Sequence, residues 1–146
     1  MKFYSRDEYH KQKWDKKIIW KENCPFCNPE QNEEYIVWKG EFWYILRNFS
    51  PYTWDENHLM AVPYEHIAFS TDLTIEHLKE LELVHKFVAE YFSGRNYFSF
   101  TRESLSWRSV EHLHMHFLPW IIQGKYLRHM LMNQWFPIKQ DLQITF

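Results

Sequence analysis

Glycine and cysteine are scarce in this sequence, and neither sign of charge is in large excess. Of its 146 residues, 3 are Gly and 2 are Cys, and 17 Lys and Arg stand against 19 Asp and Glu, for a net charge near −2. Such a balance excludes a general nucleic-acid-coating role, which needs a basic surface, but not a small anionic ligand in a local pocket. Two cysteines close together do not form a disulfide framework for a chain of this size.

No segment has the character of a secretion signal or a membrane span. Residues 1–21 are heavily charged and contain no apolar core of a signal peptide. The longest strongly apolar stretches, such as residues 115–123, are too short or interrupted to cross a bilayer. We therefore expect a cytoplasmic protein that contacts neither membranes nor nucleic acid.

Apolar and aromatic residues are abundant enough for one core. They make up 45% and 20% of the chain, and the 8 Trp predict packing by large flat side chains. The length fits a single domain, residues 1–146. We expect an N-terminal extension with a short helix at 5–17 (residues 1–23), a core (24–120) and an aromatic tail (121–146).

Hydrophobic patterning predicts an α+β fold, with an antiparallel sheet of about five strands and one long helix packed on it. Gly40-Glu41 separates two β-branched and aromatic runs, which indicates a hairpin. Ser93-Gly94 ends the helical pattern. The expected elements are strands at 34–39, 42–47, 58–62, 97–101 and 110–118, and a helix at 75–92.

The strongest motif is EHLHMHFL at residues 111–118. Side chains alternate across a strand, so His112, His114 and His116 should share one face, opposite an apolar face of Leu113, Met115 and Phe117. Three imidazoles in a row are candidate nucleophiles or metal ligands. A hydrolytic zinc site held by this histidine row is one reading of the pattern.

The motif resembles the signature of the histidine triad family, in which three histidines alternate with apolar residues. Residues 57–66 (NHLMAVPYEH) resemble a second family segment, a strand opened by His and closed by Pro-x-x-His, and Asn48 and Ser109-Val110 also match. The resemblance covers roughly residues 24–120. Two matching segments in the right order make it specific.

The resemblance implies a covalent mechanism on a nucleotide. His114 would attack the α-phosphorus, and water, phosphate or another acceptor would release the nucleoside monophosphate. His58 and His116 would steady the nucleophile and the phosphate charge. Ser109 would bind the leaving group or a phosphate oxygen, and Asn48 the ribose, although turn chemistry explains Asn48 equally well.

The Cys24-Pro-Phe-Cys27 motif has metal-ligand spacing, but two ligands do not complete a zinc site. Zinc-bearing family members add the His of Pro-x-x-His and the first triad His, here His66 and His112. The resemblance therefore implies structural zinc on Cys24, Cys27, His66 and His112. A redox pair is the alternative, disfavoured because Asn28-Pro29 follows at once where a redox motif would open a helix.

The chain departs from the family in the segment before the triad, residues 101–108, which contains no Gly. Arg102 or Arg108 could serve there as a phosphate clamp, with plain solvated charge as the alternative. Several functions stay open: hydrolysis of a phosphoanhydride, ester or phosphoramidate, phosphorolysis of diadenosine polyphosphates, or nucleotide binding without catalysis. Family members are often homodimers, and we expect one here.

Overall fold

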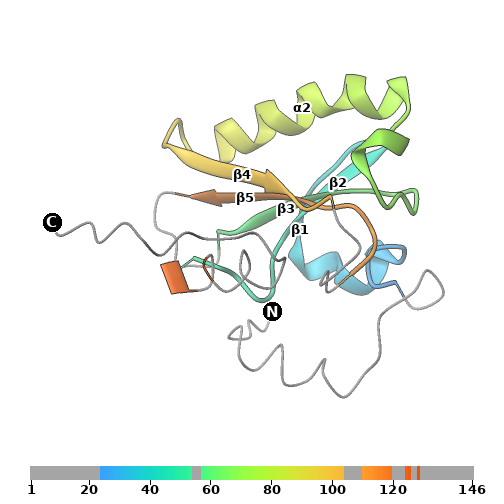
Figure 1. Ribbon diagram of the computed structural model, residues 1–146. Helices are drawn as coiled ribbons and strands as arrows, with labels where there is room; N and C mark the ends of the chain where they lie inside the picture. The colour runs from blue at the N-terminus through green and yellow to red at the C-terminus, as the bar shows by residue number, and fades with distance from the viewer. Residues whose placement is uncertain (1–23, 54–56, 104–109, 120–123, 126–127, 129–146) are drawn as a thin grey trace, which may run out of the picture.

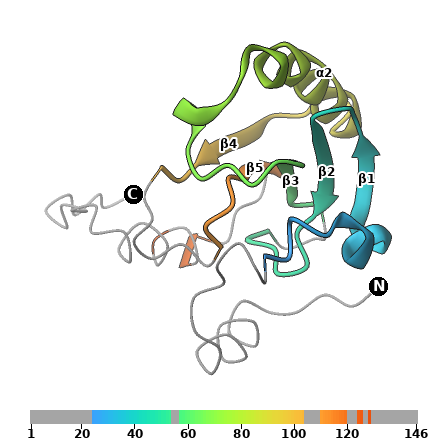
Figure 2. The same ribbon diagram turned by 90° about the vertical axis from the view of Figure 1, so that its right-hand side faces the viewer.

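The computed structural model describes residues 24–53, 57–103, 110–119, 124, 125 and 128. In this part of the chain, a five-stranded antiparallel sheet has the order β1-β2-β3-β5-β4. One long helix, α2 (Ile75–Tyr91), lies along one face of the sheet (Figures 1 and 2). The predicted α+β fold is confirmed. The predicted helix at 5–17 lies outside the described residues, as does the tail except for positions 124, 125 and 128.

The strands at the middle of the predicted set start within one residue of their predicted positions, whereas the first and last strands start later by two and five residues. Residues 34 and 35 end a 3-10 helix instead of opening a strand, and residues 110–114 precede the last strand instead of forming part of it. The elements are η2 (Pro29–Tyr35), β1 (Ile36–Lys39), β2 (Trp43–Arg47), β3 (Leu59–Pro63), η3 (Ser70–Asp72), β4 (Tyr97–Thr101) and β5 (Met115–Pro119).

Helix α2 begins and ends where the sequence signals it. Thr74 caps the first turn, and its side chain forms a capping box with His77. At the other end Ser93 and Gly94 have φ angles of 52° and 70°, in the left-handed region that stops a helix. No helix in the described part of the chain has the length and apolar character that a bilayer span requires.

A carboxylate on α2 holds the hairpin that joins β1 and β2. The Glu80 side chain accepts hydrogen bonds from the backbone N–H groups of Glu41, Phe42 and Trp43, at 2.7, 2.7 and 2.8 Å. Gly40 permits this approach, because a Cβ there would stand 2.7 Å from Cδ of Glu80 and 2.6 Å from the Trp38 ring. The turn predicted at Gly40-Glu41 is thus fixed by a distant residue.

Alternating side chains of the same strands form two separate hydrophobic clusters, one on each face of the sheet. The helix-side cluster contains Trp43, Ile45, Leu59, Ala61, Phe117, Val84, Val88 and Phe92 among its buried members. The opposite cluster contains Tyr44, Leu46, Met60 and Val62, covered by Cys24, Phe26 and Tyr35. Figure 2 shows the segment of residues 24–35, in blue, on the side of the sheet away from α2.

Candidate functional site

His114 lies just before β5, with its proton position set by the backbone. Its Nδ1 is 2.7 Å from the carbonyl oxygen of His112, which can only accept a hydrogen bond. Nδ1 therefore carries the proton, and the lone pair of the neutral ring lies on Nε2. The side chain is buried, since the residue is 7% exposed. This is the tautomer that an imidazole needs to attack through Nε2.

His58 and His116 form a hydrogen-bonded pair whose direction is also fixed by the backbone. The N–H of Tyr52 donates to Nδ1 of His58 at 3.1 Å, so neutral His58 carries its proton on Nε2. That Nε2 lies 2.8 Å from Nδ1 of His116. His116 therefore accepts on Nδ1 and carries its own proton on Nε2. The His116 ring centroid is 4.8 Å from that of His114, so the three imidazoles form one group.

Asn48 makes the turn contact that the sequence offered as the alternative to ribose binding, and it also lies beside the histidines. Its Oδ1 accepts a hydrogen bond from the N–H of Ser50 at 2.9 Å, which is turn chemistry. Its Nδ2 lies 3.4 Å from Nδ1 of His58, which places the amide beside the histidines. Asn48 is 5% exposed.

Three aromatic residues that sequence reasoning missed pack against the imidazoles. The ring of Phe100 stacks on that of His116, with 4.6 Å between the ring centroids and 16° between the ring planes. The ring of Tyr52 packs on that of His58, with 5.0 Å between the centroids. Phe26 contacts His114 at 5.3 Å. Phe100 could have been found by pairing strands, because it lies opposite His116 in the register of β4 and β5.

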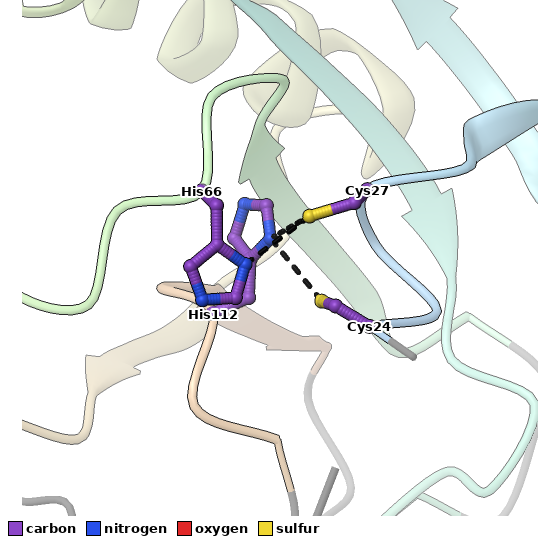
Figure 3. Close-up of side chains that lie close together, drawn as sticks. All are labelled: Cys24, Cys27, His66 and His112. Carbon is purple, nitrogen blue, oxygen red and sulfur yellow. Dashed lines mark hydrogen bonds between the residues drawn. The ribbon is translucent and has the colours of Figure 1, made fainter. Parts of the chain in front are cut away.

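A second group lies next to the imidazoles: the side chains of Cys24, Cys27, His66 and His112 converge (Figure 3). One potential ligand atom from each lies within 4.8 Å of all the others. Nδ1 of His112 is 3.4 Å from Sγ of Cys24 and 3.5 Å from Sγ of Cys27, and Nδ1 of His66 is 3.1 Å from Sγ of Cys27. Two thiols and two imidazoles at such distances are a possible metal site.

His112 is prepared for ligation through Nδ1. Its Nε2–H donates to the carbonyl oxygen of Pro63 at 2.7 Å, so the lone pair on Nδ1 faces the thiols. Burial lowers the pKa of His112 to about 4, which keeps the ring neutral at neutral pH, as a metal ligand must be.

The triad histidines do not share one metal. His112 faces the two cysteines, whereas His116 is hydrogen-bonded to His58. The reading of the histidine row as a hydrolytic zinc site was therefore wrong, because the three rings point to different partners. Ser109 and Arg108, predicted to bind substrate, lie outside the described residues.

Comparison with known proteins identifies the family and the fold. A family model described as "Scavenger mRNA decapping enzyme C-term binding" matches residues 23–131, most of the chain. The chain belongs to the histidine triad family. The family predicted from the motifs is thus confirmed. No curated protein matches the sequence at a significant level.

Solved structures of histidine triad proteins share the fold. A HIT family hydrolase from Clostridium thermocellum is 27% identical with a TM-score of 0.56, over 68% of this chain and 92% of that one. A HIT family hydrolase from Legionella pneumophila is 25% identical with a TM-score of 0.54, over 66% and 91%. A diadenosine triphosphate hydrolase from Plasmodium falciparum, 15% identical over 71% and 76%, has the same fold at a TM-score of 0.53. The hydrolase relatives support an enzyme.

Proposed function

We propose that the protein hydrolyses a nucleotide at its α-phosphorus through a covalent nucleotidyl-His114 intermediate and releases a nucleoside monophosphate. One observation carries the proposal: the hydrogen bond from Nδ1 of His114 to the carbonyl oxygen of His112 leaves the lone pair on Nε2. In the first step Nε2 forms a bond to phosphorus while the bond to the leaving group breaks. In the second, a water oxygen bonds to phosphorus as the phosphorus–nitrogen bond breaks; the water gives up a proton to solvent, and the ring leaves neutral with its proton on Nδ1.

The neighbouring groups stabilise charge during both steps. His116 carries its proton on Nε2, and its ring adjoins that of His114, so it suits donation to a phosphate oxygen or to the leaving group. His58 supports His116 through their hydrogen bond. Asn48 would contact the ribose and Ser109 the leaving group or a phosphate oxygen, as the family resemblance implies. Arg108 would act as a phosphate clamp in the segment where the chain departs from the family.

The test is release of nucleoside monophosphate by wild type, His114→Ala and a control, His85→Ala, at an exposed histidine on α2. The substrates are adenosine phosphoramidate, diadenosine triphosphate and tetraphosphate, and a capped dinucleotide. The matching family model is named for a decapping enzyme, and one structure of the same fold is a diadenosine triphosphate hydrolase. Wild type and His85→Ala should turn over at least one substrate. His114→Ala should lose on the order of 10⁴-fold or more in kcat.

Other outcomes of this assay select between the alternatives. Equal rates for wild type and His114→Ala would refute the covalent mechanism. Added phosphate that converts the product to a nucleoside diphosphate would show phosphorolysis instead of hydrolysis. Nucleotide binding without turnover of any substrate would favour a binding module.

We also propose that the metal is zinc, held structurally by Cys24, Cys27, His66 and His112. The donor set of two thiolates and two imidazoles is one that zinc prefers, and four protein ligands leave no open position for water. When bound, the ion would supply a crosslink between the loop at Cys24 and the segment that carries His114. Because thiol ligands must stay reduced, this proposal agrees with a cytoplasmic location.

A homodimer remains our proposal for the assembly. Strand β4 stands at the edge of the sheet, next to β5 alone among the described strands, and Phe98 on it is 45% exposed. An edge strand of this kind can pair with its counterpart in a second copy. Light scattering at micromolar concentration should give twice the chain mass; the mass of one chain would count against the dimer.

A further inference from the structure

Phe26 lies between the two cysteines of the metal site and touches both functional groups of the molecule. Its ring is 5.9 Å from the ring of the ligand His112, at 87°, and 5.3 Å from the ring of His114, at 56°. The two contacts use a single side chain that is 4% exposed. Any displacement of the Cys24–Cys27 loop would therefore move a group that packs directly on His114.

A second connection runs through the backbone of His112. The carbonyl oxygen of this residue accepts the hydrogen bond that fixes the His114 tautomer, at 2.7 Å. Its side chain is held by the Pro63 carbonyl and faces both thiols. The next residue, Leu113, donates its N–H to the carbonyl oxygen of Ile67 at 2.6 Å, beside the ligand His66. The orientation of the carbonyl that His114 uses is thus tied to the metal site.

The position of Phe26 is itself fixed from behind. The hydroxyl of Tyr44 donates to the Phe26 carbonyl oxygen at 2.9 Å, and Tyr44 is fully buried in β2. Three kinds of contact therefore hold the loop. The thiols lie against the two ligand histidines, the Phe26 carbonyl accepts from Tyr44 in the sheet, and the Phe26 ring packs on the histidines. The ring is the one of these that reaches His114.

We propose that Phe26 is a positioning residue that couples metal binding at Cys24 and Cys27 to the orientation of His114. This inference rests on the proposed function of His114 as the nucleophile. With the metal bound, the loop holds the Phe26 ring against the imidazole, and the imidazole stays with Nδ1–H on the His112 carbonyl. Without the metal, or without the ring, His114 rotates or exchanges tautomers, and Nε2 no longer aims at the substrate. The metal centre then governs catalysis without touching the substrate.

The experiment compares four proteins purified without chelator: wild type, Phe26→Leu, Phe26→Tyr and Phe42→Leu. Phe42→Leu makes the same chemical change on the helix side of the sheet, where Phe42 packs beside His77. Three quantities are measured: metal per chain, the His114 tautomer by nitrogen-15 NMR of the imidazole, and kcat and KM separately. The first two need no substrate, so they test the coupling even if no nucleotide is turned over.

The expected result distinguishes the orientation of His114 from the binding of metal and substrate. Phe26→Leu should keep its metal, show a mixed or inverted His114 tautomer, and lose about 10- to 100-fold in kcat with KM within about twofold of wild type. Phe26→Tyr, which keeps the ring, and Phe42→Leu should match wild type in all three. Wild type stripped with chelator should show the same altered tautomer as Phe26→Leu.

Three results would overturn the proposal. The first is an unchanged His114 tautomer in metal-loaded Phe26→Leu. The second is loss of metal from Phe26→Leu, which would mean that the side chain serves the metal site alone. The third is a Phe26→Tyr protein as altered as Phe26→Leu, which would mean that the contact does not depend on the ring.

Discussion

The two faces of the sheet are made by the same strands but hold different chemistry. Trp43 and Ile45 of β2 face α2 in a cluster of apolar side chains, whereas Tyr44 and Leu46 face the loop at Cys24. On that second side the molecule buries polar groups: Asn48, His58, His112, His114 and His116 are each at most 7% exposed.

This contrast separates what makes the fold from what makes the site. Apolar contacts on the helix face are non-directional and tolerate change in proportion to the volume lost. Buried imidazoles on the other face need specific partners, and each triad histidine has one: Pro63 for His112, the His112 carbonyl for His114, and His58 for His116. Substitutions on the two faces should therefore change different quantities.

The largest effect is expected at the proposed zinc site. Cys27→Ser should abolish stoichiometric zinc and lower the free energy of unfolding by several kcal/mol, since structural zinc contributes on the order of 10 kcal/mol in small zinc peptides. Metal analysis and denaturant unfolding measure both quantities. Chelator should destabilise wild type but leave Cys27→Ser unchanged; a variant that still holds zinc would disprove the ligand set.

The helix face should give a smaller loss, confined to stability. Phe92→Ala removes a ring that is 2% exposed and packs on Tyr91 and Tyr97, and should cost about 3–5 kcal/mol. Leu83→Ala, at a position 51% exposed on the same helix, is the control and should cost far less. In conditions where both variants stay folded, kcat and zinc content should equal those of wild type. A loss of kcat or of zinc would contradict the separation of stability and function between the two faces.

The hairpin anchor should rank next. Glu80→Gln replaces a carboxylate that accepts three backbone hydrogen bonds with an amide that has one acceptor oxygen, at a cost of about 1–3 kcal/mol. Chemical denaturation measures this loss. Glu82→Gln, which alters an exposed carboxylate on the same helix, serves as the control. Equal stability of the two variants would mean that the Glu80 hydrogen bonds do not contribute to the stability of the hairpin.

The smallest change is expected on the outer surface of α2. Lys86→Ala breaks an ion pair with Glu82 in which both side chains are more than half exposed, at 64% and 70%. Solvent screening makes such pairs contribute little. The thermal midpoint, zinc content and kcat should all match wild type, which sets the baseline against which the other variants are read.

Much of the fold was predictable because local signals and tertiary packing agree. The hairpin, α2 and its end at Ser93-Gly94 follow from turn residues and hydrophobic period. The alternation in the triad also put Leu113 and Phe117 correctly in the helix-side cluster. The metal group followed from the family resemblance, and its four side chains do converge.

The rest depends on contacts between distant segments, which a pattern does not contain. Strand β5 starts at Met115 and not at residue 110, because Leu113 bonds to Ile67 and His112 to Pro63, away from the ladder with β3. The sequence also did not single out Phe26 or Tyr52. Each lies in a loop and contacts the histidines only in the folded chain.

The nearer of two donors at Nδ1 of His58 is the main-chain N–H of Tyr52, at 3.1 Å, against 3.4 Å for the side-chain amide of Asn48. Nineteen of the twenty amino acids at position 52 would supply the same N–H, and proline alone would remove it. The direction of the hydrogen bond in the pair therefore depends on the backbone shape of the turn and not on the side chain at position 52. Evolution could change the ring at Tyr52, and with it the surroundings of the site, without reversing the direction of the hydrogen bond from His58 to His116.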